Sequence, residues 1–215
     1  MRLAGVRIGA EDVAGTIASY AALLAVPAAP RADGGARFTL ERGTVDIVAG
    51  PPGLLAVRFV VEAGETPLAS AHGVPLVSDA ESSPDAPPPA AAIDHVVVNT
   101  AAPERAIALW RDRAGLRLAL DREFSARHLR LLFFRSGGIT LEYASPLPPS
   151  GVAAEDDRLF GVSYRVPDLA ARRERLLAAG VDVSTPRPGM RPGTTVASVR
   201  SGTGGVRTLL LQVDA

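Results

Sequence analysis

The 215-residue chain contains no cysteine and no lysine. Without cysteine it can form no disulfide bond, no thiolate zinc site and no cysteine nucleophile. Any metal ion would therefore have to be bound by histidine and carboxylate side chains. All 23 basic residues are arginine. Together with the many alanines and prolines, this indicates a bacterial-type base composition of the genome rather than a device for binding phosphate.

Net charge and long apolar runs are also missing. The 23 basic and 23 acidic residues cancel, which removes the bulk attraction that nucleic acid or an anionic membrane would exert. No apolar run reaches the roughly 18–20 residues of a membrane span, and the first residues lack the pattern of a secretory signal. We therefore expect a cytoplasmic protein whose partner is a small molecule, with neither nucleic acid nor membrane as a partner.

A segment rich in proline, serine and acidic residues interrupts the chain at residues 78–92. A segment of this composition cannot build a packed core, so it is typical of a linker or a long surface loop. We expect it to separate an N-terminal half, residues 1–77, from a C-terminal half, residues 93–215. Both halves contain enough apolar residues for a core.

A repeated unit connects the two halves. A strand-like run at residues 3–10 precedes a helical pattern of apolar residues, and a run at 93–100 precedes the same pattern, displaced by 90 residues. The apolar positions of the two patterns are Val13, Ile17, Tyr20 and Leu24, and Pro103, Ile107, Trp110 and Ala114. Steps of four, three and four residues put each set on one helix face. Tyr20 and Trp110 are therefore predicted to be equivalent core residues.

A second pair of runs, residues 54–61 and 159–166, matches at an offset of 105 residues. The chain then divides into four modules: A (1–50), B (51–77), C (93–148) and D (155–215). The patterns in modules C and D each predict one strand, one helix and three further strands. Module A predicts a βαββ core, and module B is truncated by the linker. We expect an α+β fold of repeated βαβββ modules.

The element boundaries follow from turn and cap residues. In module C we expect a helix over 104–114, ended by Gly115, and strands over 116–124, 128–135 and 139–144. In module D we expect a strand over 159–166, a helix over 169–179 with Asp168 as its N-cap, and strands near 181–184, 195–200 and 207–213.

These motifs resemble a known family. In module C the runs 93–98, 103–110, 115–118 and 138–142 resemble the first module of the vicinal oxygen chelate superfamily. That group includes glyoxalase I, extradiol dioxygenases, methylmalonyl-CoA epimerase, fosfomycin-resistance enzymes and bleomycin-binding proteins. The runs 160–169 and 208–212 resemble its second module, whereas the N-terminal half resembles the superfamily only weakly. Because many chemistries share this scaffold, the resemblance implies the fold more strongly than the activity.

The resemblance implies mixed sheets that curl into a cup, with the helices outside. It also implies a divalent metal ion (iron, manganese, nickel or zinc) held in the cup by histidine and glutamate. The histidine comes from the first strand and the glutamate from the last strand of each module. His95 and Glu142 hold these positions in module C. In module D the positions fall on Gly161 and Gln212. Gln212 is then expected as a weak third ligand, or the site is degenerate and holds no metal.

The N-terminal modules depart from the pattern as well. The histidine position falls on Gly5 in module A and on Ala56 in module B. Opposite Glu142, module A offers Asp46 or Ile47. We therefore expect no complete metal site in the N-terminal half.

Four further residues are candidates for lining a substrate pocket. Asn99 shares the strand face of His95, because residues two apart point the same way. Phe133 and its neighbour Phe134 lie on opposite faces of one strand, and we assign the pocket position to Phe134. Tyr164 and His128 complete the set; their alternatives are ordinary packing for Tyr164 and a solvated strand end for His128.

Two functions stay open from the sequence. The first is a divalent-metal lyase, isomerase or dioxygenase that acts on a small oxygen-rich substrate, with His95, Glu142 and Gln212 on the metal and Glu142 moving a proton. The second is a metal-free protein that binds or sequesters a small molecule, as in the bleomycin-resistance branch. Four modules in one chain can imitate a two-subunit arrangement, so we expect a monomer or a homodimer.

Overall fold

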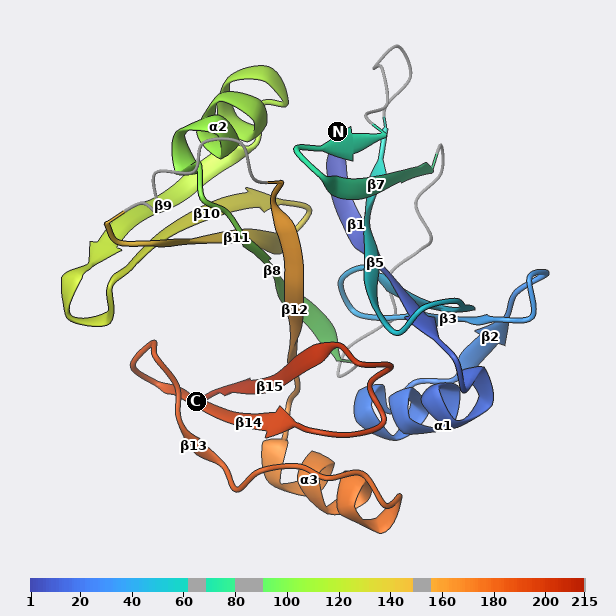
Figure 1. The fold of residues 1–215 in the computed structure, drawn as a ribbon. Coiled ribbons are helices and arrows are strands. Elements are labelled where there is room, and N and C mark those ends of the chain that lie inside the picture. Colours follow the sequence, from blue (N-terminus) through green and yellow to red (C-terminus); the bar gives the residue numbers. More distant parts are fainter. Residues whose placement is uncertain (62–68, 80–90, 149–155, 215) are drawn as a thin grey trace. The chain divides into compact units, whose positions relative to one another are not determined.

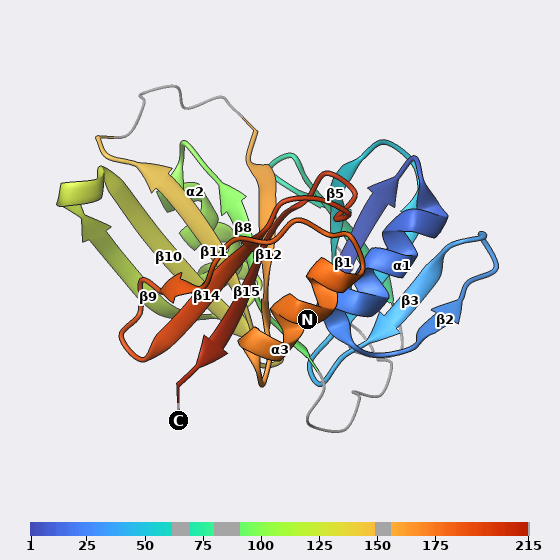
Figure 2. The same ribbon diagram turned by 90° about the horizontal axis from the view of Figure 1, so that it is seen from below.

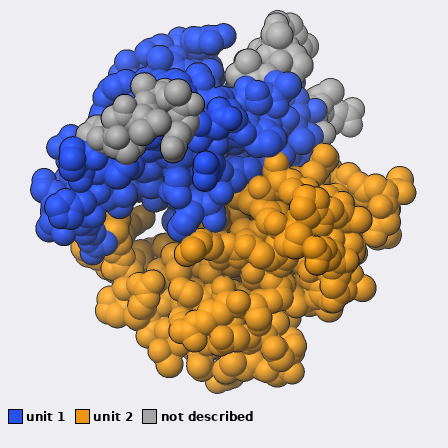
Figure 3. Space-filling model, in the orientation of Figure 1, with its two compact units in different colours: residues 1–4, 56–82, 95–160 blue, residues 5–55, 83–94, 161–215 orange. Residues whose placement is uncertain are grey.

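A computed structural model describes residues 1–61, 69–79, 91–148 and 156–214. The chain forms two compact units, each made of pieces from both halves of the sequence (Figure 3). Unit 1 comprises residues 1–4, 56–82 and 95–160, and unit 2 comprises residues 5–55, 83–94 and 161–215. The expected sequential halves, 1–77 and 93–215, therefore differ from the units that the contacts define.

Module C supplies most of unit 1. Its elements are β8 (Ala92–Asn99), α2 (Pro103–Ile107), the π-helix η1 (Ala108–Arg113), β9 (Arg117–Phe124), the short 3-10 helix η2 (Ser125–Arg127), β10 (Leu129–Ser136) and β11 (Ile139–Pro146). The strands lie in the order β8-β11-β10-β9 (Figure 1). β8 and β11 are parallel, and the other two pairs are antiparallel. This is the predicted βαβββ plan.

The helix of module C changes form along its length. Pro103 occupies its first turn, where the missing N–H costs nothing. After Ile107 the helix widens, and the Ala114 N–H donates to the carbonyl of Leu109, five residues back, at 2.9 Å. Gly115 follows in the left-handed region with φ +69°, as its predicted capping role requires. The expected helix is therefore present, but more than half of it is π-helix.

The core of unit 1 is centred on Trp110, which is fully buried. Its indole Nε1 donates to the hydroxyl of Tyr143 at 2.8 Å. The ring of Phe59, from a distant part of the sequence, stacks on the indole with centroids 5.4 Å apart. Phe59 lies on β5 (Gly53–Val60), which pairs in parallel with β7 (Val74–Asp79); the two-residue β6 (Ser70–Ala71) pairs with β7. The truncated module B thus contributes to the core around module C.

Most of the predicted linker and part of module B lie outside the described residues. β7 ends at Asp79 and β8 begins at Ala92, so both ends of the 78–92 segment are strand residues. No helix spans a membrane among the parts of the chain that the structure describes, because none is long and apolar enough.

Module A forms a complete βαβββ unit, one strand more than expected. Its elements are β1 (Arg2–Ala10), α1 (Val13–Leu24), β2 (Ala28–Pro30), β3 (Ala36–Thr39) and β4 (Thr44–Ala49). The strand order is β2-β3-β4-β1, with β4 and β1 parallel. Asp12 caps α1 by accepting the Gly15 N–H at 2.9 Å, which satisfies one of the unpaired amides at the start of the helix.

Module D repeats the same order within unit 2. Its elements are β12 (Arg158–Arg165), α3 (Leu169–Ala178), β13 (Arg187–Pro188), β14 (Thr194–Val199) and β15 (Arg207–Val213). The order is β13-β14-β15-β12, with β15 and β12 parallel. The predicted N-cap is confirmed, since Asp168 accepts the Ala171 N–H at 2.9 Å. The strand expected at 181–184 is reduced to a single bridge between Val183 and Val199.

Modules A and D share the core of unit 2. The fully buried ring of Tyr20 contacts Tyr164 edge-on at 6.3 Å and Phe38 at 6.2 Å. Helix α1 packs against α3 (Figure 2), where the buried Arg172 donates to the carbonyl of Leu23. Tyr20 and Trp110 are both fully buried aromatic residues of module helices, as the 90-residue repeat predicts.

Candidate functional site

Strands β8 and β11 bring His95 and Glu142 together on one face of the module C sheet. In the parallel register His95 lies beside Thr140, and Glu142, two residues further, lies beside Val97. Tyr143 alternates to the opposite face, where it meets Trp110. The pair therefore points away from α2 and η1. We call this side of the sheet the His95 face.

The geometry of the pair allows joint contact with a ligand. His95 Nε2 lies 3.8 Å from Glu142 Oε2, and the two side chains are 18% and 17% exposed. This separation is too long for a direct hydrogen bond, but it is an ion-pair distance when the imidazole is protonated. One polar group of a ligand, a hydroxyl for example, could contact both side chains at once.

Apolar residues continue the His95 face beyond the pair. Phe133 on β10 lies directly opposite Glu142, and Leu120 on β9 lies opposite Phe133. Both are half-buried. Phe134, the residue assigned to the pocket from sequence, is fully buried on the other side, where its ring meets Tyr143 edge-on at 5.8 Å. The sequence predicts that Phe133 and Phe134 lie on opposite faces of the strand. Only the pairing register of β10 and β11 shows that Phe133 is the residue beside Glu142.

The other predicted pocket residues lie in different surroundings. Asn99 shares the His95 face at the exposed end of β8, opposite Ala144. Tyr164 belongs to the core of unit 2, where burial raises the pKa of its hydroxyl well above the ordinary value. His128 is exposed at the end of η2 with φ +51°, and its carbonyl accepts the Leu147 N–H. Among these residues only Asn99 is on the face that carries the His–Glu pair.

Gln212 is not at the position in module D that corresponds to Glu142, contrary to the expectation from the sequence. Gly161 pairs with Arg207 in module D as His95 pairs with Thr140 in module C. Two residues further along β15, the counterpart of Glu142 is therefore Leu209. Gln212 points to the opposite face, and its amide oxygen accepts the Leu169 N–H at the start of α3 at 2.7 Å. A polar residue near the end of the strand had suggested a ligand, whereas its contact is a helix cap.

The glycines at the two lost histidine positions are required by the backbone. A Cβ added at Gly161 would lie 2.5 Å from the carbonyl oxygen of Arg207, and one added at Gly5 would lie 2.2 Å from that of Thr44. In both modules the neighbouring parallel strand occupies the space of the side chain. A histidine could enter these positions only if a strand moved.

The donor set does not fit a complete metal site. His95 and Glu142 are two donors, whereas protein sites for iron, zinc and related ions generally supply three or four. Among residues 1–61, 69–79, 91–148 and 156–214, no group of three or more histidine, aspartate or glutamate side chains is arranged to hold a metal ion.

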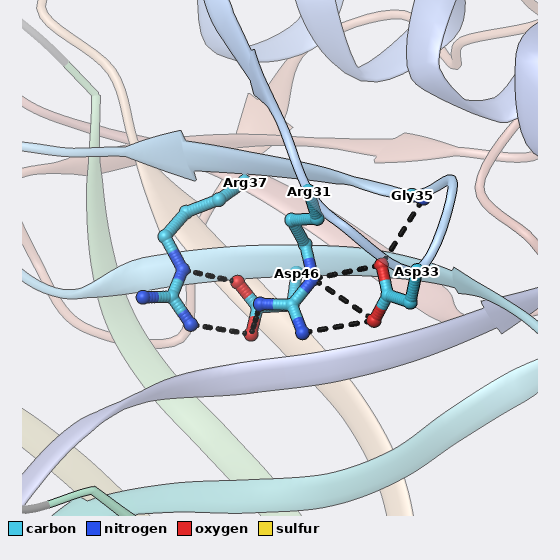
Figure 4. A network of polar contacts seen from close by, with 5 residues as sticks. All are labelled: Arg31, Asp33, Gly35, Arg37 and Asp46. Carbon is cyan, nitrogen blue, oxygen red and sulfur yellow. Dashed lines mark hydrogen bonds and ion pairs between the residues drawn. The ribbon is translucent and has the colours of Figure 1, made fainter.

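Module A replaces the metal-ligand position with an ion-pair network. Gly5 pairs with Thr44 and Arg7 with Asp46, so Asp46 rather than Ile47 is the counterpart of Glu142. Its carboxylate is fully buried and receives two hydrogen bonds from Arg37, at 2.6 and 2.8 Å, and one from Arg31 at 3.1 Å (Figure 4). The hydrogen bonds that Arg37 donates to Asp46 raise the pKa of its guanidinium above the ordinary value. The carboxylate is thus neutralised by cations that belong to the protein.

Comparison with known proteins agrees with the predicted family. Residues 94–197 match the sequence model of the Glyoxalase/Bleomycin resistance protein/Dioxygenase superfamily. No curated protein matches the chain.

Several solved structures are similar to part of the chain. Methylmalonyl-CoA epimerase from Mycobacterium tuberculosis is 24% identical, with 57% of this chain and 87% of that chain covered and a TM-score of 0.46. A hypothetical protein from Bacillus halodurans is 17% identical, with coverages of 58% and 96% and a TM-score of 0.48. Methylmalonyl-CoA epimerase from Streptomyces coelicolor, in complex with 2-nitronate-propionyl-CoA, is 17% identical, with coverages of 57% and 97% and a TM-score of 0.46.

The βαβββ modules, the His–Glu pair on the first and last strands of module C and the sequence match agree with one another. Residues 94–197, which span most of modules C and D, therefore match the Glyoxalase/Bleomycin resistance protein/Dioxygenase superfamily.

Proposed function

We propose that the chain binds a small organic molecule on the His95 face of module C, without a tightly held metal ion. The donor set is the main support. His95 and Glu142 lie 3.8 Å apart, but Leu209 replaces the second glutamate and the amide oxygen of Gln212 is hydrogen-bonded to the start of α3. Two donors suit contact with a polar group better than retention of a metal ion.

The composition of the His95 face supports the same function. Phe133 and Leu120 offer apolar surface next to Glu142, while the imidazole and the carboxylate offer a hydrogen-bond donor and acceptors. Small-molecule sites generally combine apolar walls with a few polar groups that fix orientation. The expected ligand therefore has an apolar body and one hydroxyl, carbonyl or amine group that reaches the pair.

A second candidate function is favoured by the closeness of His95 and Glu142. It is a divalent-metal lyase, isomerase or dioxygenase acting on a small oxygen-rich substrate. In that case the two side chains would be protein ligands of the metal, and the remaining positions would need water or substrate oxygens. Since the described residues supply no third protein donor, this function stands behind the first.

Metal analysis separates the two functions. Protein purified without a histidine tag would be analysed for iron, manganese, nickel and zinc, beside His95→Ala and the matched control His128→Ala, which removes an exposed histidine from the same module. We expect no stoichiometric metal in any of the three. Stoichiometric metal in the wild type and His128→Ala that is lost in His95→Ala would contradict metal-free binding and support the enzyme.

Ligand binding is tested separately. A panel of small organic molecules would be screened by thermal shift, and a hit would be titrated against Glu142→Gln, Phe133→Ala and His128→Ala. We expect affinity to fall about tenfold or more for the first two variants, because each loses a direct contact, and to stay unchanged for the third. Equal affinity in all variants would place the ligand elsewhere and overturn the proposal.

A further inference from the structure

The network around Asp46 occupies the side of module A that corresponds to the His95 face. Arg7 on β1 and Arg37 on β3 both lie beside Asp46 on β4 in the strand register. The three side chains therefore form one row across the sheet. Arg31, just after β2, reaches the same carboxylate. We call this group, with Asp33, the Asp46 face.

Two of the arginines are fixed by acidic partners. Arg37 forms a two-bond fork with Asp46. Arg31 bridges two aspartates, with Nε and Nη2 on Asp33 and Nη1 on Asp46 (Figure 4). Their side chains remain 22% and 26% exposed, for Arg31 and Arg37 respectively, while that of Asp46 is inaccessible. Asp46 thus acts as an internal anchor that holds guanidinium groups at the surface of the sheet.

Arg7 differs from its two neighbours. Its side-chain Nε is buried and has no hydrogen-bond partner among the described residues. A buried guanidinium nitrogen is normally hydrogen-bonded, since leaving it unsatisfied is costly. With Arg7 included, three arginines face two aspartates, so the Asp46 face has an excess positive charge.

The excess positive charge is carried by guanidinium groups, which favour an anionic ligand. Guanidinium forks match the geometry of carboxylate and phosphate oxygens. A cation is disfavoured, because the one buried carboxylate already accepts hydrogen bonds from two arginines. We propose that the Asp46 face binds the carboxylate or phosphate group of a small ligand through Arg7, with Arg31 and Arg37 as a fixed positive platform. This site is separate from the His95 face and independent of its function.

Anion titration tests the site. The full chain would be titrated by calorimetry with inorganic phosphate and with acetate, with ionic strength held constant by sodium chloride. The variants are Arg7→Gln, the charge-matched control Arg200→Gln, whose side chain is 59% exposed on unit 2, and His95→Ala. We expect binding of at least one anion to the wild type and both controls. Affinity should fall about tenfold or more in Arg7→Gln, because one charged fork is lost.

Measuring the stability of each variant separates a loss of anion binding from a loss of folding. The melting temperature of each variant would be measured with and without the anion that binds, since a ligand of the native state raises it. Arg7→Lys would be included, because it keeps the charge and removes the fork; it should show an intermediate shift. No anion binding by the wild type, or equal binding by wild type and Arg7→Gln, would overturn the proposal. The anion that binds identifies the ligand group as phosphate or carboxylate.

Discussion

At the scale of single residues, the side chains divide by strand face. On β10 and β11, alternate residues either enter the core under the helix or line the His95 face. Phe134 and Tyr143 enter the core, whereas Phe133 and Glu142 line the His95 face. A substitution should therefore affect stability on one face and ligand binding on the other.

The hydrogen bond between Trp110 and Tyr143 is the clearest case on the core side. Tyr143→Phe removes the acceptor of a fully buried indole N–H, so we expect a loss of about 1–3 kcal/mol in the free energy of unfolding. The measurement is urea denaturation of the wild type, Tyr143→Phe, Trp110→Phe and the double variant. If the hydrogen bond causes the loss, Tyr143→Phe costs less in the Trp110→Phe background. An equal cost in both backgrounds would assign the effect to packing.

At the scale of elements, parallel strand pairs explain why modules A and D cannot carry a second histidine. In each, a glycine on the first strand lets the carbonyl of the last strand approach closely. Module C has His95 at this position beside Thr140. Modules A and D therefore lack the histidine of module C for two reasons. The residue at that position is glycine, and the neighbouring strand leaves no space for a side chain.

Gly161→Ala tests this close approach. The new methyl group would lie 2.5 Å from a backbone oxygen, so β12 and β15 would have to shift, at a cost of about 1–3 kcal/mol in unfolding free energy. The comparison is Gly180→Ala, where no atom lies within 4 Å of the added Cβ and only φ +75° opposes the change; about 1 kcal/mol is expected there. A Gly161→Ala protein as stable as the wild type, measured by urea denaturation, would show that the strands separate easily.

At the scale of the whole molecule, each compact unit combines distant parts of the chain. Phe59 covers Trp110 in unit 1, and Tyr20 covers Tyr164 in unit 2. The C-terminal half therefore relies on aromatic residues that precede the 78–92 segment.

A fragment of residues 92–215 tests this dependence. Without Phe59, Tyr20 and the carbonyl that Arg172 contacts, we expect no cooperative thermal transition and a weak near-ultraviolet circular dichroism signal, because large apolar surfaces of both cores would be exposed. Co-expression with residues 1–91 should restore both. A fragment that unfolds cooperatively, with the near-ultraviolet spectrum expected for its aromatic residues, would instead support residues 93–215 as an independent domain.

The sequence by itself determined the modules, their helices and most strand boundaries, because apolar periodicity, caps and turn glycines are local signals. It also placed His95 and Glu142 on the first and last strands of module C, where the structure has them. Only the tertiary structure decided which residues meet across strands. Register made Leu209 rather than Gln212 the counterpart of Glu142, and Phe133 rather than Phe134 its neighbour. Register and long-range packing depend on pairings between distant residues, so a local pattern cannot specify them.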